Sequence, residues 1–299
     1  MDFTSRFFRI LEKKRKTIDI DKIFKLKKKK EIILPLGSCF LDMFGTELMK
    51  KKFNIFSNSK PNALVDKSYQ YFFGHFDNPL NLLNNLERII LKNWKLKDRD
   101  YVYSKKFGHF INLHVKARFK TKNLNNLKNR ILEIDNYLLN EIKESSLILL
   151  SFDTNEVWID KFSKKAWYAF YGNLFTQKCF NNQAKLEILN YENTKITIKK
   201  IIKILSKVGK KKKFILMVSP HRLLITYSNK DVQIADLYCK STYLSTYSDL
   251  ECSHISYFPA FEILNNLNER EIFRRDDYIH VTHKTIKNYL MPYFEKLYF

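Results

Sequence analysis

Two continuous apolar runs most constrain the fold of this chain. Residues 147–152 (Leu-Ile-Leu-Leu-Ser-Phe) and 214–218 (Phe-Ile-Leu-Met-Val) contain almost no polar side chain. Runs of this length without polar alternation are typical of strands buried on both faces of a parallel sheet. Segments with helical periodicity, such as residues 195–208, stand between them and can cover both faces. The chain is therefore predicted to fold as a three-layer α/β/α sandwich with a central parallel sheet.

The same patterns place the other elements. Predicted strands cover residues 32–36, 53–56, 147–152, 214–218 and 253–258. Predicted helices cover residues 40–52, 80–90, 124–145, 195–208, 236–250 and 282–297. Asp77-Asn78-Pro79 is a start signal for the second of these helices. Residues 94–116 lack a clear period and are expected to form an insertion or a small hairpin. No apolar stretch approaches the roughly 20 residues of a membrane-spanning helix.

The first 30 residues differ from the rest of the chain. They are rich in lysine and arginine, and they form a basic extension ahead of one domain at residues 31–299. Phe3, Phe7 and Phe8 could line one side of a short amphipathic helix that docks on an anionic membrane surface. The alternative is a solvated extension that packs its few apolar residues on the domain. The sequence leaves both interpretations open.

Composition limits the choice of partners. The net charge of +23 invites a nucleic-acid interpretation. However, Lys, Asn, Ile, Phe and Tyr are abundant while glycine and proline number 6 each, which is the skew that A/T-rich codons produce. No nucleic-acid-binding motif is recognisable, so nucleic acid is not the expected partner. The 4 cysteines show no metal-ligand spacing, and neither a metal nor a cofactor is expected.

A serine and a histidine near opposite ends of the chain suggest catalysis. Ser38 lies in the run Leu36-Gly37-Ser38-Cys39-Phe40, between the first predicted strand and the first helix. At such a corner a hydroxyl is exposed, and the N–H groups of the helix start can stabilise an oxyanion. Asp277-Tyr278-Ile279-His280 supplies a histidine base with a carboxylate to orient it. The pair indicates a serine hydrolase or acyltransferase, whereas a turn or helix-capping serine is the alternative.

Two neighbouring residues compete for these roles. Cys39 follows Ser38 directly, but it is expected to point into the core between helix and sheet. His283 lies three residues after His280 and could share a helix face with it. Only His280 has an aspartate at the D-x-x-H spacing, so His280 is the predicted base and Asp277 its partner.

Several sequence blocks, taken in order, resemble one family. The chain is similar to the GSCFA family, a branch of the SGNH/GDSL-like hydrolases, from about Ile32 to Phe294. The matching blocks are Gly37-Ser38-Cys39-Phe40, Ser151 to Trp158 with Glu156-Val157-Trp158, Met217-Val218-Ser219-Pro220, Lys240-Ser241, Tyr257 to Ile263, and Asp277-x-x-His280. Any one block is weak, but six in order are improbable by chance.

The chain departs from the family pattern at four positions. Leu41 follows Phe40 where the family usually has a small residue, and Asp153 stands where a glycine is expected. His221 follows Ser219-Pro220 where an apolar residue is usual, and Val281 replaces the proline after the terminal histidine. These changes bear on the oxyanion region more than on the nucleophile.

The resemblance implies roles for particular residues. It implies an SGNH (flavodoxin-like) sandwich with Ser38 as nucleophile and Asp277 and His280 as its partners. In SGNH-like enzymes the oxyanion donors are the N–H of the nucleophile, a glycine N–H and an asparagine side chain, for which Gly74 and Asn155 are candidates. A plain turn for Gly74 and a capping role for Asn155 are the alternatives.

The expected function is hydrolysis or transfer of an acyl group through acyl-Ser38. The family resemblance suggests an acylated carbohydrate or small ester as substrate, such as a cell-envelope glycan precursor. Residues 1–10 lack a signal-peptide pattern, which favours a cytoplasmic location with optional binding at the inner membrane surface. A catalytically inactive module that binds polyanionic glycan, lipid or nucleic acid is the alternative.

Overall fold

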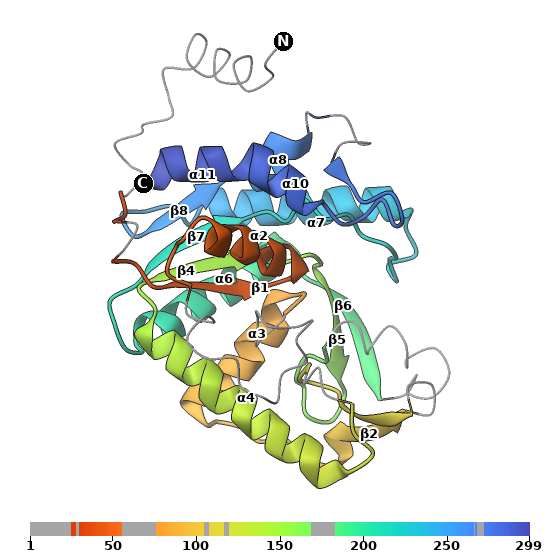
Figure 1. Ribbon diagram of the computed structural model, residues 1–299. Coiled ribbons are helices and arrows are strands. Elements are labelled where there is room, and N and C mark those ends of the chain that lie inside the picture. Colours follow the sequence, from red (N-terminus) through yellow and green to blue (C-terminus); the bar gives the residue numbers. More distant parts are fainter. Residues whose placement is uncertain are drawn as a thin grey trace.

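The central feature of the fold is a parallel sheet of four strands (Figure 1). The computed structural model describes residues 25–27, 30–55, 76–104, 108–116, 120–168, 183–265, 267 and 272–299. The strands are β1 (Ile33–Gly37), β4 (Leu147–Ser151), β7 (Lys213–Met217) and β8 (Ile255–Phe258), in the order β1-β4-β7-β8. Every neighbouring pair runs parallel. The predicted α/β class and parallel sheet are confirmed.

The predicted strand at 53–56 is reduced to a single bridge. Ile55 forms a parallel bridge with Ile33 at the free edge of β1, and residues from 56 onward lie outside the described residues. Counting this bridge as the second strand gives the flavodoxin-like order 2-1-3-4-5. In such sheets ligands bind outside the carboxyl ends of the strands where the order reverses, here between β1 and β4.

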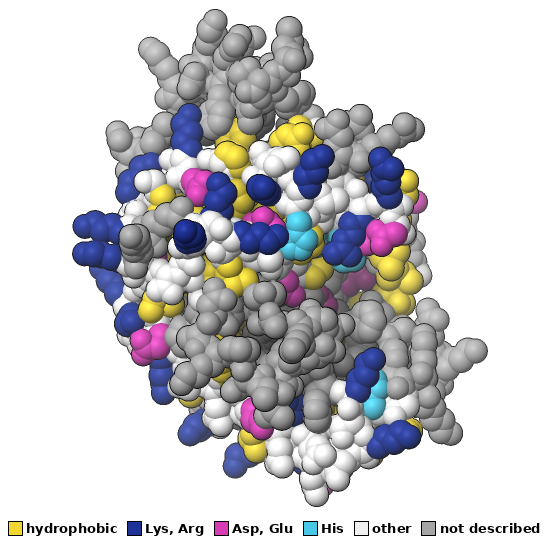
Figure 2. Space-filling view, viewed as in Figure 1, with side chains coloured by type: hydrophobic (Ala, Val, Ile, Leu, Met, Phe, Trp, Pro, Cys, Tyr) yellow, Lys and Arg dark blue, Asp and Glu magenta, His cyan; other side chains and the backbone are white. Residues whose placement is uncertain are grey.

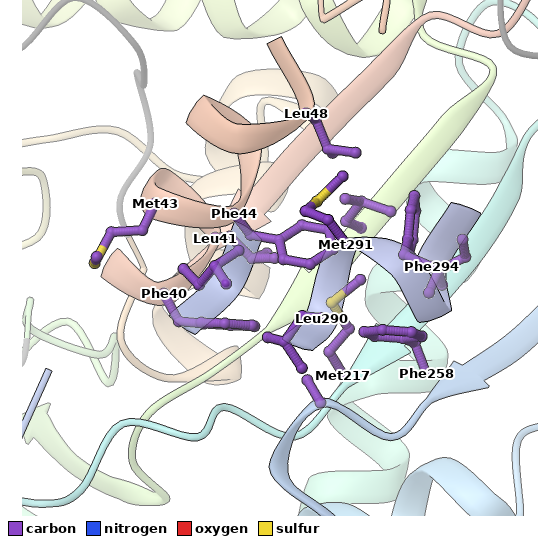
Figure 3. Close-up of a cluster of buried hydrophobic side chains, with 14 of the residues drawn as sticks. Phe40, Leu41, Met43, Phe44, Leu48, Met217, Phe258, Leu290, Met291 and Phe294 are labelled. Atoms are coloured by element: carbon purple, nitrogen blue, oxygen red, sulfur yellow. The ribbon is translucent and has the colours of Figure 1, made fainter. Parts of the chain in front are cut away.

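Alternate residues of the strands face two separate cores, which creates the three layers. Leu147 and Leu149 of β4 join one core, and Ile148 and Leu150 join the other. The first core is covered by α2 (Cys39–Lys50) and α11 (Met291–Tyr298), whose phenylalanines meet there (Figure 3). The second core is covered by α3 (Pro79–Leu86), α4 (Leu124–Glu144), α6 (Tyr191–Ser206) and α7 (Val232–Ser248).

Capping residues set the starts of these helices. Asn78 accepts a hydrogen bond from the Asn81 N–H, so α3 begins where the Asp-Asn-Pro signal predicts. Asn190 caps α6 in the same way, and α6 therefore begins before the predicted residue 195. The remaining helical segments are the π-helices Glu87–Leu91 and Ile286–Leu290, the 3₁₀ turn Asp98–Asp100, α8 (Ala260–Asn265) and α10 (His283–Thr285).

Two antiparallel ribbons stand apart from the central sheet. The first, β2 (Tyr101–Ser104) with β3 (His109–Asn112), is the small hairpin expected within residues 94–116. The second pairs β5 (Glu156–Asp160) with β6 (Ala184–Ile188), and the sequence patterns did not predict it. The Tyr168 N–H donates to the Leu113 carbonyl at 2.6 Å, which joins the two ribbons.

Residues 25–27 pack against the other end of the chain. Leu26 is buried in the first core, and its N–H donates to the Tyr298 carbonyl at 2.7 Å. Lys25 Nζ donates to the Leu297 carbonyl at 2.9 Å. The rest of the predicted basic extension, residues 1–24 and 28–29, lies outside the described residues. None of the described helices combines the length and apolar character needed to cross a bilayer.

Candidate active site

The corner between β1 and α2 holds Ser38 at the carboxyl edge of the sheet. The Ser38 N–H donates to the Ser151 carbonyl of β4 at 2.9 Å, and the Phe76 N–H donates to the Gly37 carbonyl at 2.8 Å. A Cβ on Gly37 would lie 1.9 Å from the Ser151 oxygen, so only glycine fits at this position. The close approach of two strands therefore fixes the backbone of Ser38.

The Ser38 hydroxyl is not used to cap the helix that it begins. Ser38 occupies the N-cap position of α2, yet its side chain makes no capping hydrogen bond. Its Oγ is buried and has no hydrogen-bond partner in the described part of the chain. A buried hydroxyl without a partner is costly. The capping alternative therefore does not describe this side chain.

Asp277 and His280 form a hydrogen-bonded pair in the turn before α10. His280 Nδ1 lies 2.7 Å from Asp277 Oδ2. The other oxygen, Asp277 Oδ1, accepts from the N–H groups of Ile279 at 2.8 Å and His280 at 3.0 Å. Burial acts to raise the pKa of Asp277, but the hydrogen bonds from these two N–H groups and from the His280 ring outweigh it and lower that pKa to about 2. The carboxylate therefore stays ionised and orients Nδ1.

The fold brings this turn to the start of α2. The Cys39 thiol and a ring nitrogen each of His221 and His280 lie within 4.8 Å of one another. The His221 and His280 rings meet edge to face with centroids 4.9 Å apart. Cys39 is adjacent to Ser38, so residues from the two ends of the domain share one site. Both parts of this site come from sequence blocks that resemble the GSCFA family. A comparison with protein-family models agrees, because the model described as GSCFA family matches residues 32–294.

The chain belongs to the GSCFA family. A comparison with curated protein sequences finds no match. The family assignment covers the whole central sheet and both ends of the candidate site.

In this GSCFA protein, Cys39 does not point into the core, contrary to expectation. Its Sγ lies 3.1 Å from His221 Nδ1 and 3.4 Å from Asp153 Oδ2. Burial raises the pKa of the thiol well above its usual range, and the negative charges of Asp153, Asp77 and Asp42 raise it further. A thiol kept neutral in this way is a weak nucleophile.

Two residues noted as departures from the family pattern line the site. Asp153 contacts Cys39, and its Oδ1 is buried without a hydrogen-bond partner among the described residues. His221 is buried, and burial lowers its pKa well below the usual range, with the neighbouring basic groups of His280, Lys240 and Arg274 adding to the effect. His221 is therefore a neutral ring. Neither residue was among the predicted site residues, although their unusual position in the family blocks was the available signal.

Some of the candidate oxyanion donors already have hydrogen-bond acceptors within the protein. The Ser38 N–H is already bound to the Ser151 carbonyl. The N–H groups of Cys39 and Phe40 open α2, where helical geometry gives them no intrahelical acceptor. Asn155 is buried and its Nδ2 donates to the Leu189 carbonyl at 3.0 Å, so one of its two amide donors is engaged. Gly74 lies outside the described residues.

A cavity opens beside the Asp277–His280 turn. Its volume is about 520 Å³, and Asp277, Tyr278 and Ile279 form part of its wall. The remaining wall is largely apolar and includes Leu223, Leu237, Phe261, Leu264 and Phe273. Arg222 also lines it and stacks 4.3 Å from the centroid of the Phe273 ring. Figure 2 shows histidine side chains reaching the surface in the middle of one face, with lysine and arginine side chains around them.

Proposed function

We propose that this GSCFA protein is a serine-dependent ester hydrolase or acyltransferase. The observation that supports it most is the Asp277–His280 pair, with Nδ1 and Oδ2 2.7 Å apart, beside the residue that follows Ser38. An Asp–His pair next to a buried, unpartnered serine hydroxyl is the arrangement that activates a hydroxyl nucleophile.

The reaction proceeds through an acyl-serine. His280 Nε2 accepts the hydroxyl proton as Ser38 Oγ attacks the acyl carbon, and Asp277 stabilises the resulting imidazolium. The N–H groups at the start of α2 stabilise the oxyanion. His280 then gives the proton to the leaving alcohol, and water or an acceptor hydroxyl attacks the acyl-serine in the second half. Ser38 Oγ and His280 make no hydrogen bond without substrate, so this contact tightens when substrate binds.

The substrate is an acylated carbohydrate or a related small ester. The cavity beside Asp277 has a wall that does not include Ser38 or His280. It combines an apolar surface, suited to an acyl chain, with the charged groups of Arg222, Asp236 and Asp277. Sugar hydroxyls and anionic groups of an envelope precursor are compatible with this mixture. Residues 1–30 are proposed to add affinity for an anionic membrane surface.

Covalent labelling tests the proposal. A fluorophosphonate probe should modify the folded protein, and peptide mapping should place the adduct on Ser38. The variants Ser38→Ala and Cys39→Ala separate the two neighbours: only Ser38→Ala should abolish labelling and esterase activity. An unlabelled wild-type protein would favour the inactive binding module.

Cys39 is the second candidate nucleophile because its Sγ lies 3.1 Å from His221 Nδ1. A thiol reagent such as iodoacetamide should react slowly with it, given the raised pKa. Loss of activity in Cys39→Ala together with retained activity in Ser38→Ala would identify a thiol enzyme instead.

A further inference from the structure

A second group of ligand-type side chains lies between the two ribbons, away from Ser38. Asp100 ends the 3₁₀ turn before β2, His114 follows β3, and Asp160 ends β5. The three side chains come from two ribbons that are separate in sequence and are all buried. One oxygen or nitrogen atom from each lies within 4.8 Å of the others.

The His114 ring directs one buried nitrogen, Nε2, at this group. His114 Nδ1 lies 2.9 Å from the Ala166 carbonyl, which can only accept, so Nδ1 carries the proton. A ring that carries only this proton has an acceptor at Nε2. It has no hydrogen-bond partner among the residues that the structure describes, and His114 is 0% exposed. Nε2 faces Asp100 Oδ1 at 3.6 Å, which is too long for a hydrogen bond.

Backbone and indole groups orient the two carboxylates. Asp100 Oδ2 accepts from the Lys97 N–H at 2.7 Å. Asp160 Oδ1 accepts from two N–H groups in the turn that follows it, and Asp160 Oδ2 accepts from the Trp167 indole at 3.2 Å. Outer hydrogen bonds of this kind, together with the Nδ1 contact of His114, are those that fix metal ligands in protein sites.

The acidic side chains of this group outnumber its basic one, with two aspartates to one histidine. The two carboxylates share the single imidazole of His114, whose Nε2 lies 3.6 Å from Asp100 Oδ1. Besides His114, the basic group recorded beside Asp100 within the described ranges is Arg99, whose Nε lies 3.9 Å from Oδ1 and whose side chain is 43% exposed. Asp160 has no ion pair with any described residue. Buried charges without compensation are strongly unfavourable, and a dication at the centre would remove the imbalance.

We propose that Asp100, His114 and Asp160 bind one divalent transition-metal ion that ties the β2–β3 ribbon to the β5–β6 ribbon. Zinc–nitrogen and zinc–oxygen bonds of about 2.0–2.2 Å place tetrahedral ligand atoms about 3.4 Å apart. The 3.6 Å between His114 Nε2 and Asp100 Oδ1 is close to this separation. An imidazole nitrogen among the ligands favours Zn²⁺ over Mg²⁺ and Ca²⁺.

This ion has a structural role and does not depend on the proposed ester chemistry. Asp160 stands at the far end of β5 from Glu156, which is the end nearer to Asp153 and the Ser38 site. The expectation of no metal came from searching for cysteine-based spacings. An Asp–His–Asp set drawn from two ribbons has no such short spacing, so the sequence pattern does not indicate it.

Zinc content and thermal stability test the site. The full chain is stripped with a chelator, incubated with Zn²⁺ and desalted, and its zinc is counted by elemental analysis. His114→Gln should lower the zinc content by one equivalent per chain and lose the rise in Tm that Zn²⁺ gives the wild type. His109→Gln, on the same ribbon, is the matched control and should retain both. Mg²⁺ and Ca²⁺ at equal concentration should give no shift.

The Cys39–His221–His280 group is the competing zinc site, and two further variants decide between them. Cys39→Ser should leave the ion assigned to His114 in place. Asp100→Asn provides the same test as His114→Gln if the latter does not fold. A wild type that retains no zinc would overturn the proposal and leave a protonated His114 as the partner of the two carboxylates. Zinc that is lost in Cys39→Ser but kept in His114→Gln would also overturn it.

Discussion

His280 and His283 lie three residues apart and each has an acidic partner, yet their surroundings differ. His280 Nδ1 binds Asp277 at 2.7 Å, and its ring meets His221 beside Cys39. His283 Nδ1 binds Glu47 Oε1 at 2.9 Å. Glu47 lies on α2 about 13 Å beyond Ser38 at 1.5 Å per residue. A carboxylate partner therefore does not distinguish the proposed base, His280, from His283. Its position relative to the start of α2 is what separates the two histidines.

The largest expected effect is that of removing the His280 side chain. His280→Ala should lower kcat/KM for a soluble ester on the order of 10³-fold or more, because no group would accept the Ser38 proton. Steady-state kinetics on a short-chain acyl ester measures this. The comparison fails if His280→Ala keeps its activity while His283→Ala loses it, because the D-x-x-H assignment would then be wrong even with Ser38 labelled.

Asp277→Asn should have a smaller but still large effect. The asparagine can still accept from the N–H groups of Ile279 and His280, but it no longer stabilises the imidazolium or selects its tautomer. We expect a loss of about 10²-fold in kcat with little change in KM. A variant with normal kcat would show that His280 needs no carboxylate.

The pH dependence of activity tests the pairing of His280 with Asp277. Activity should fall at acid pH as the base becomes protonated. Asp277, with its pKa lowered to about 2, stays ionised through this range, so the fall belongs to the histidine. In Asp277→Asn the imidazolium loses its stabilising charge, and the fall should move to lower pH. An unchanged profile of kcat/KM against pH in that variant would contradict the assigned pairing.

His283→Ala should affect stability more than rate. Glu47 is 3% exposed at its side chain and keeps its contact with Lys50, whereas His283 is 45% exposed. Losing a half-exposed hydrogen bond to a carboxylate should cost about 1 kcal/mol of unfolding free energy. Urea denaturation measures this. Activity within about twofold of the wild type is expected, and a larger fall would mean that His283 contributes to the chemistry.

Truncation of the N-terminal segment should change the rate least. A chain that begins at Lys25 keeps the contacts of Leu26 with α11, whereas one that begins at Glu31 loses them and with them about 1.5–3 kcal/mol of burial. Both should hydrolyse a soluble ester at nearly the wild-type rate and bind anionic vesicles more weakly in a sedimentation assay. Vesicle binding equal to that of the full chain would refute a membrane role for residues 1–30.

The sequence predicted the parallel sheet because its signal is local. The apolar runs of β4 and β7 and the capping residues before α3 act within a few residues of themselves, so the pattern is visible without knowledge of the fold. The β5–β6 ribbon was missed for the opposite reason. It pairs Glu156–Asp160 with Ala184–Ile188, which are separated in the sequence by residues 161–183. Its strands carry mixed polar and apolar residues that give no clear period.

The candidate site shows the same limit. Ser38, Asp277 and His280 were proposed from short blocks, and their roles stay predictions. The wrong expectation for Cys39 came from treating the first residue of α2 as core-facing, whereas it faces His221 and Asp153. Which side of a helix start faces the sheet depends on how the helix packs on the sheet. The short motif around Cys39 does not determine that packing.

The hydrogen bond from the Ser38 N–H to the Ser151 carbonyl makes the proposed nucleophile the last rung of the β1–β4 ladder. Its amide can exchange with solvent only when this end of the ladder opens. The hydrogen bond fixes the serine backbone relative to β4. Any adjustment that brings the Ser38 hydroxyl and the His280 imidazole together must come from the serine χ1 angle or from the turn that carries His280. Substrate binding is therefore expected to change the conformation of these two parts first.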